Sequence, residues 1–201
     1  VGVDPELFTP LPGVARQPGR LITTASADVA LKGLSYLLEA MAKLRTERDD
    51  IRLTIIGKPR AGASADLIDK LGLRPHIDFV SGVPDERIVE LYAEAELAVV
   101  PSLYEGFGNA FLEAVYYKRL ILVNNYSIYE VDIKPKGFRT VWLDGYISAR
   151  TIAAVRHSLQ TPDLTREWAE TNYQLAKRYF SFTVLEHRLQ TILDDCLGHQ
   201  A

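Results

Sequence analysis

The sequence has few of the residues that build disulfide-bonded or metal-held proteins. It contains a single cysteine, Cys196, among 201 residues. One cysteine excludes an internal disulfide and a cysteine-based zinc site, and it favours a reducing compartment, so we expect a cytoplasmic location. The four histidines do not show the spacing of metal ligands, and no D-x-D pair occurs. We therefore expect no bound metal ion.

Charge and hydrophobicity exclude two further classes of protein. The chain has 23 basic and 26 acidic residues and a net charge of -3, which argues against a broad nucleic-acid-binding surface. No apolar run approaches the ~20 residues that a membrane-spanning helix requires. Hydrophobic and charged contents of 47% and 24% are ordinary for a soluble globular protein, and the length suits one domain with a real core.

A stretch in the middle of the chain predicts a strand, a glycine loop, a helix and a second strand. Short apolar runs at 97–100 and 120–123 are typical of buried parallel strands. Between them, apolar residues at helical spacing follow Gly106 and Gly108. A helix that begins at the carboxyl edge of a parallel sheet presents free N–H groups to anions, and glycines let a ligand approach the backbone closely. We therefore predict an anion site at this helix.

Two carboxylates belong to the same segment. Glu105 lies in the predicted loop and Glu113 lies about one turn inside the predicted helix. Because helical side chains tilt toward the N-terminus, both carboxylates should face the same crevice. Carboxylates repel phosphate, so hydroxyl groups are their plausible partners. This combination indicates a ligand that carries both phosphate and sugar.

The segment 101–108, P-S-L-Y-E-G-F-G, with Glu113 eight positions after Glu105, resembles the E-x7-E signature of the family-four retaining glycosyltransferases. Those enzymes have two Rossmann-like domains, and the signature belongs to the C-terminal domain, which binds the nucleotide-sugar donor. The resemblance implies that Glu113 binds the ribose hydroxyls. It makes Glu105 the catalytic candidate, in contact with the hydroxyls of the transferred sugar. The donor is a substrate, so no separate cofactor is expected. The alternative is that Glu105 is a solvated turn residue and Glu113 an ordinary helix acid.

The same resemblance suggests further donor-binding residues. Lys32, followed by Gly33, matches the lysine of the family's R-x-x-x-x-K-G pattern, which contacts the donor diphosphate. The arginine of that pattern is replaced by Ala27, and Ser26 offers a neutral hydrogen-bond donor there. The segment around Ser81 and Val83 follows the third predicted strand, where the family receives the nucleobase. A surface lysine and an ordinary turn are the corresponding alternatives.

The glycine loop holds two more candidates for the donor site, beside the backbone of Gly106 and Gly108. Phe107 either anchors the loop in the core while the neighbouring backbone binds the ligand, or binds the donor itself. Asn109 suits a helix cap, which we prefer to a ligand contact. After Glu113, many relatives have small residues and glycine, whereas this chain has V-Y-Y-K-R at 115–119. We expect this bulk to alter donor preference.

Alternation of strands and helices over 20–180 predicts one α/β domain, a Rossmann-like parallel sheet with helices on both faces. Residues 1–19 resemble the linker that joins the two domains of the family, and 181–201 its C-terminal crossover helix. We expect a loop at 126–138 and a short strand at 140–143. Three helices should close the chain, at about 147–160, 163–179 and 182–197.

The leading functional expectation is the donor-binding half of a retaining glycosyltransferase, inactive in transfer without its N-terminal acceptor-binding domain. A nucleotide-sugar isomerase or phosphorylase of similar architecture, and a non-catalytic nucleotide-sugar-binding module, are left open. Peripheral membrane association of the full-length enzyme is also left open. The last predicted helix carries an apolar stripe that would be exposed without the facing domain and favours weak self-association: Leu185, Leu189, Ile192 and Cys196.

Overall fold

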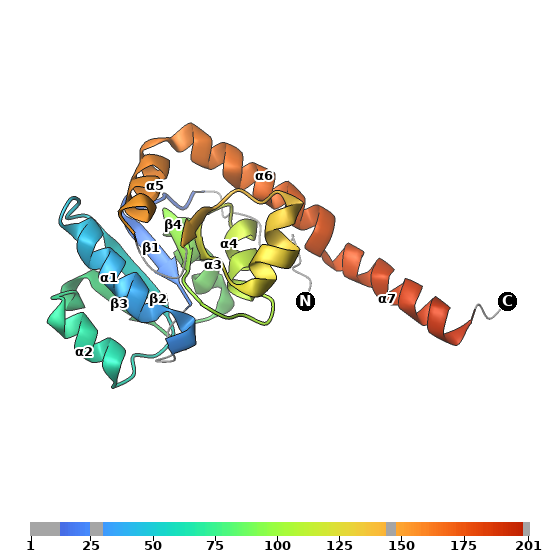
Figure 1. The fold of residues 1–201 in the computed structure, drawn as a ribbon, viewed down its shortest axis with the longest axis horizontal. Coiled ribbons are helices and arrows are strands. Elements are labelled where there is room, and N and C mark those ends of the chain that lie inside the picture. The colour runs from blue at the N-terminus through green and yellow to red at the C-terminus, as the bar shows by residue number, and fades with distance from the viewer. Residues whose placement is uncertain (1–12, 25–29, 144–147, 199–201) are drawn as a thin grey trace.

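The computed structural model describes residues 13–24, 30–143 and 148–198, and it confirms the predicted α/β class. Its centre is a six-stranded sheet in the order β3-β2-β1-β4-β5-β6, in which every neighbouring pair is parallel (Figure 1). The strands are β1 (Arg20–Thr23), β2 (Arg52–Ile56), β3 (Ile77–Val80), β4 (Leu97–Val100), β5 (Leu120–Asn124) and β6 (Val141–Leu143). The strand order reverses between β1 and β4. In open α/β sheets, ligands bind outside the carboxyl ends of the strands at such a point.

Helices cover both faces of the sheet. The longer ones are α1 (Leu34–Arg45), α2 (Ala63–Lys70), α3 (Asp85–Glu94), α4 (Asn109–Tyr116), α5 (Ala149–Gln160), α6 (Pro162–Phe180) and α7 (Phe182–Leu197). The short helical turns are η1 (Ala30–Lys32), η2 (Arg74–His76), η3 (Tyr129–Ile133) and η4 (Lys134–Lys136). The predicted linker falls largely on residues 1–12, outside the described residues.

The core forms two layers because successive side chains of a strand point to opposite faces. In β1, Leu21 packs in the layer with α1, α2 and α5, whereas Ile22 packs in the layer with α3, α4 and α6. Every residue of β4 and β5 is buried. Burial on both faces explains why these two strands are unbroken apolar runs in the sequence.

The loop expected at 126–138 is wrong, because most of this segment is helical. It contains the π-helical turn η3 and the 3-10 turn η4. Tyr129 and Ile133, four residues apart, are both fully buried, and Phe138 packs edge-on against Phe111 with ring centroids 5.3 Å apart. The apolar spacing was therefore that of a helical turn. Pro135 directed the sequence interpretation toward a loop.

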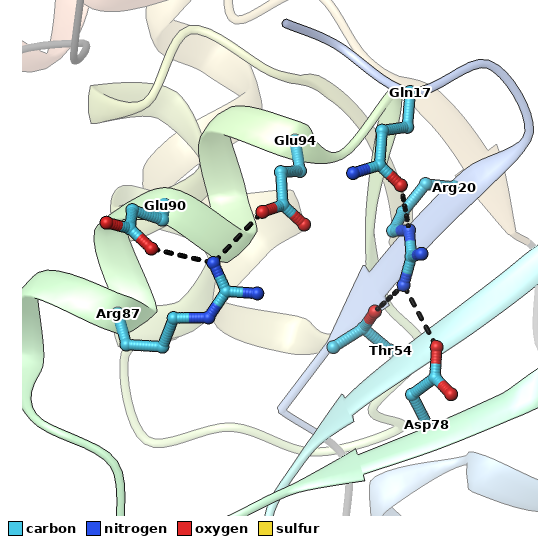
Figure 2. A network of polar contacts seen from close by, with 7 residues as sticks. All are labelled: Gln17, Arg20, Thr54, Asp78, Arg87, Glu90 and Glu94. Carbon is cyan, nitrogen blue, oxygen red and sulfur yellow. Dashed lines mark hydrogen bonds and ion pairs between the residues drawn. The ribbon is translucent and has the colours of Figure 1, made fainter. Parts of the chain in front are cut away.

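Polar contacts tie the first strands together at their amino-terminal half (Figure 2). Arg20 donates to Asp78 of β3 at 3.0 Å and to Thr54 of β2 at 3.1 Å, so one guanidinium spans three strands. On α3, Arg87 donates to Glu94 at 3.0 Å, within a small ion-pair group on that helix. Arg20 is the first residue of β1, so its contacts start at the end of this strand opposite to the carboxyl end where a ligand is expected.

Arg119 is a buried cation that joins the ends of two helices. Its guanidinium donates to the carbonyl oxygens of Ala93 and Ala95, at the end of α3, at 3.0 and 3.1 Å. Its Nε donates to the carbonyl oxygen of Tyr117, which follows α4, at 2.7 Å. Burial lowers the pKa of Arg119 to about 10, so the side chain stays charged at neutral pH. A cation near helix C-termini is favourable because the last carbonyl groups of a helix lack intrahelical donors.

The last helix, α7, extends away from the body of the domain (Figure 1). It contains no buried residue, and Leu189 and Ile192 are 50% and 57% exposed. The predicted helix at 182–197 is confirmed, and its apolar stripe lies in solvent. Among the described residues, no helix is both long and apolar enough to cross a membrane.

Candidate nucleotide-sugar site

A cleft of about 450 Å³ opens where β1 and β4 end, at the reversal of strand order. This volume lies within the usual range of small-molecule sites. The residues that line the cleft are Thr24, Lys32, Glu105, Gly106, Phe107, Gly108, Asn109, Ala110 and Glu113. The structure therefore brings together Lys32 and the whole glycine-loop set of candidate residues, although they are more than 70 positions apart in the sequence.

The loops that follow β1 and β4 are packed directly against each other. Gly33 has a φ of 68°, and a Cβ at this position would lie 2.1 Å from the carbonyl oxygen of Pro101. The N–H of Leu103 donates to the carbonyl oxygen of Leu31 at 2.8 Å. Only glycine combines this left-handed geometry with such a close approach of two backbones. The contact holds Lys32 at the cleft beside the glycine loop.

The first turn of α4 faces the cleft. Gly108, with a φ of 98°, occupies the cap position before α4, and a Cβ there would lie 2.2 Å from the Tyr126 hydroxyl oxygen. The expected capping role of Asn109 is wrong, because Asn109 is the first residue of the helix and no side chain caps it. The side chain of Asn109 is exposed and lines the cleft. The first N–H groups of α4 have no acceptor within their own helix, so they suit an anion.

Lys32 and Glu105 form an ion pair inside the cleft. The Lys32 Nζ donates to Glu105 Oε1 at 2.8 Å. The lysine side chain is 39% exposed and the glutamate side chain 17%. Two groups that the sequence assigned to different parts of a ligand, the diphosphate and the sugar, are therefore partners in this structure. A ligand that takes either group must compete with the other for it.

Glu113 is held by a residue that sequence reasoning missed. The hydroxyl group of Tyr92, on α3, donates to Glu113 Oε2 at 3.1 Å. Burial raises the pKa of Glu113, whereas the hydrogen bond from Tyr92 lowers it. Because a carboxylate in an apolar environment favours its neutral form, this hydrogen bond helps to keep Glu113 ionised.

Phe107 connects the glycine loop to the helical layer. Its ring packs edge-on against Phe180, at the end of α6, with centroids 5.4 Å apart. The Tyr126 hydroxyl group donates to the Phe107 carbonyl oxygen at 3.5 Å. Burial and the nearby Glu105 carboxylate both raise the pKa of Tyr126, so it is a neutral donor. These contacts anchor the loop, and Phe107 also lines the cleft, so its contact with the donor stays a prediction.

Two described sequence candidates lie outside the cleft. Ser81 and Val83 follow β3, the edge strand, and do not line the cleft. Ser26 and Ala27 lie outside the described residues. The structure adds Thr24 and Ala110 to the cleft. Thr24 follows β1 directly, so its place at the carboxyl end of a predicted strand was the signal for it in the sequence.

Comparison with known proteins finds relatives that are named as glycosyltransferases. An MMP alpha-(1->4)-mannosyltransferase from Mycolicibacterium hassiacum is 46% identical over 116 residues, which are 57% of this chain and 28% of that protein. The chain thus spans less than a third of the length of this relative.

Solved structures show the same fold. The C-terminal domain of a glycosyl transferase group 1 family protein from Francisella tularensis superposes with a TM-score of 0.74 at 20% identity, over 90% of this chain and all of that one. Alr3699/HepE from Anabaena, in complex with UDP, superposes with a TM-score of 0.80 at 18% identity, over 96% of this chain and 56% of that one. Both likenesses show that the fold is shared.

The family model described as glycosyl transferases group 1 matches residues 14–175, which are most of the chain. This match covers β1, the cleft, the glycine loop and most of α6. The chain therefore belongs to the glycosyl transferases group 1 family.

Proposed function

We propose that this chain is the donor-binding part of a retaining glycosyltransferase that uses a nucleoside diphosphate sugar. The observation that carries the proposal is the composition of the cleft at the end of β4. One cation, the open N-terminus of α4 and two carboxylates surround a single space. The cation and the helix N-terminus suit a diphosphate, and the carboxylates suit sugar hydroxyl groups.

Each group is assigned one part of the donor. Lys32 and the N–H groups of residues 106–109 hold the diphosphate, Glu113 holds the ribose hydroxyls, and Glu105 holds the hydroxyls of the transferred sugar. Glu105 is the proposed catalytic residue because it would touch the reacting sugar. The ion pair implies that the diphosphate draws Lys32 from Glu105, which leaves the carboxylate free to accept hydrogen bonds from the sugar.

The relatives support a nucleotide-sugar donor. One relative is named as a mannosyltransferase, and one structure of the same fold contains UDP. In this proposal the complete enzyme also has an N-terminal acceptor-binding domain that faces the cleft. The acceptor and the remaining catalytic groups belong to that domain.

Ligand-induced stabilisation tests the proposal directly. A ligand that binds only the folded chain raises its melting temperature. At a ligand concentration of 100 times the Kd, the free energy of unfolding rises by about 2.7 kcal/mol. We expect at least one of UDP, GDP and ADP, or their mannose and glucose conjugates, to raise the melting temperature of the 201-residue chain. Adenosine, uridine and guanosine, which lack phosphate, serve as controls and should have little effect. If none of the diphosphates or nucleotide sugars stabilises the protein at millimolar concentration, the proposed function is wrong.

We further propose weak self-association of the isolated chain through α7. Leu189, Ile192, Leu193 and Leu197 are all about half exposed or more, and exposed apolar surfaces of this kind favour association. Sedimentation velocity should show a rise in mean mass with concentration, and Leu189→Glu together with Ile192→Glu should abolish it. Glu186→Gln, on the same helix, is the control and should preserve it. A monomer at all concentrations would contradict the prediction.

A further inference from the structure

Two buried tyrosines lie in contact behind one of the proposed donor-binding groups. Tyr92 of α3 and Tyr117 after α4 are each 2% exposed, and neither lines the cleft. Their rings stack with centroids 4.5 Å apart and an interplanar angle of 19°. The Tyr92 hydroxyl group donates to Glu113 through the hydrogen bond of 3.1 Å, and burial together with the Glu113 charge raises the pKa of Tyr117. The cleft carboxylate is thus connected to a stacked aromatic pair in the core.

The backbone after α4 keeps Tyr117 in place. Lys118 adopts a φ of 52°, a left-handed conformation that a lysine rarely takes. The next residue, Arg119, donates to the carbonyl oxygen of Tyr117 at 2.7 Å. Lys118 itself reaches α6, where its Nζ donates to Glu170 at 2.6 Å. These contacts fix the turn that carries the stacked ring.

The residues of this turn are those whose bulk the sequence analysis expected to alter donor preference. They include Tyr116, Tyr117 and Lys118. Both tyrosines are buried, so their bulk fills the core and does not enter the cleft. These side chains can therefore affect donor binding only indirectly, through the cleft residues that they hold in place.

We propose that Tyr92 is a positioning residue for Glu113, and that Tyr117 fixes the Tyr92 ring by stacking on it. The proposal rests on the proposed function, in which Glu113 binds the ribose of the donor. Tyr92 occupies Oε2 and so orients the carboxylate, which leaves its other oxygen to accept from a ribose hydroxyl group. Preorganisation of this kind lowers the cost of binding, since the carboxylate is already oriented before the ligand arrives.

Removal of one oxygen atom tests the proposal. Tyr92→Phe keeps the ring and its stacking and removes only the hydroxyl group. We expect about a 10-fold loss of affinity for the tightest-binding of UDP, GDP and ADP, measured by titration calorimetry on the 201-residue chain. The matched control is Tyr129→Phe, which removes another buried hydroxyl group, bonded to Thr140 at 2.6 Å, away from the cleft. The affinity of Tyr129→Phe for the same nucleotide should stay within about twofold of the wild-type value.

A double-mutant cycle separates positioning from general destabilisation. In a Glu113→Ala background there is no carboxylate to orient, so Tyr92→Phe should change the affinity by less than about twofold. An equal loss in both backgrounds would overturn the proposal. Tyr117→Leu, which removes the stacked ring, should weaken binding by about threefold in the Glu113 background alone, and it carries the test if Tyr92→Phe does not fold.

The pH dependence of binding supplies a readout that loss of packing would not move. Binding needs ionised Glu113, so affinity falls as the pH drops through its pKa. Without the Tyr92 hydroxyl group that pKa rises, and the fall should occur at higher pH in Tyr92→Phe. The other charged or titratable groups around Glu113 are Asp85, Tyr117, Lys32 and Glu105, and they are unchanged in this variant.

The two possible failures are distinguishable. If the wild-type chain binds no nucleotide, the proposed function fails. If the wild-type chain binds and Tyr92→Phe binds equally tightly, with the same pH profile, only the positioning role is overturned.

Discussion

Gly33→Ala should lower the free energy of unfolding by about 3 kcal/mol or more. A left-handed φ costs an alanine roughly 1–2 kcal/mol, and overpacking typically costs a further 1–3 kcal/mol. The collision is with a backbone atom, because the new Cβ would lie 2.1 Å from the Pro101 carbonyl oxygen. A backbone cannot rotate away as a flexible side chain can. Urea denaturation of the two proteins, followed by circular dichroism, measures the difference.

Gly72→Ala is the matched control for this variant. Gly72 has a similar φ of 65°, but a Cβ there would meet no atom within 4 Å. We therefore expect Gly72→Ala to cost only the backbone term, about 1–2 kcal/mol. The difference between the two variants isolates the contact between the loops after β1 and β4. Equal losses would show that this contact is not close in solution.

Glu113→Gln should weaken the affinity for a nucleoside diphosphate, whereas Glu105→Gln should not. Glu113→Gln removes the charged acceptor of the ribose, and we expect about 10- to 150-fold weaker binding of both the diphosphate and its sugar conjugate. Glu105→Gln breaks the ion pair of 2.8 Å and releases Lys32. The diphosphate should then bind as tightly as before or more tightly, whereas the sugar conjugate loses its hydroxyl contacts.

Calorimetric titration of both ligands against both variants measures this division. The informative quantity is the ratio of the two affinities for each protein, because removal of any negative charge favours an anion. Glu39→Gln, at an exposed position on α1, controls for that general effect. Loss of the diphosphate in Glu105→Gln, or unchanged binding in Glu113→Gln, would contradict the assignment.

The ion pair changed what sequence reasoning alone expected. From the sequence, Glu105 had no role toward the diphosphate, because carboxylates repel phosphate and its partner Lys32 lies 73 positions away. The topology could be inferred, since both loops follow parallel strands. The contact between the two side chains could not, because it depends on the close approach of Gly33 to Pro101.

Periodicity predicted most of the fold because the core strands are buried on both faces. The run at 97–100 became β4 and that at 120–123 became most of β5, as expected. The helical turns η3 and η4 were missed because they are only five and three residues long, and Pro135 lies within η4. Short turns leave too few apolar positions for a spacing to be recognised.

The sequence predicted the site residues that belong to a recognisable motif, and it missed a residue that acts only by holding another residue in place. Glu105 and Glu113 belong to one continuous segment and could be found together. Tyr92 is one of several apolar positions on a helix face, and its hydroxyl group carries no sequence signal of its own. Only the packing of α3 against α4 shows that it reaches Glu113. Asn109 was assigned as a cap from its residue type, which does not reveal that Gly108 already occupies that place.

The hydrogen bonds of the buried Arg119 side chain limit how the helices beside the site can move. This side chain bonds the carbonyl groups at the end of α3 to the turn after α4, while Tyr92 and Glu113 join the same two helices nearer the cleft. Two separate contacts of this kind oppose rotation of the helices relative to each other. We therefore expect any closure over a bound donor to move α3 and α4 together, with the larger changes in the loops at their ends.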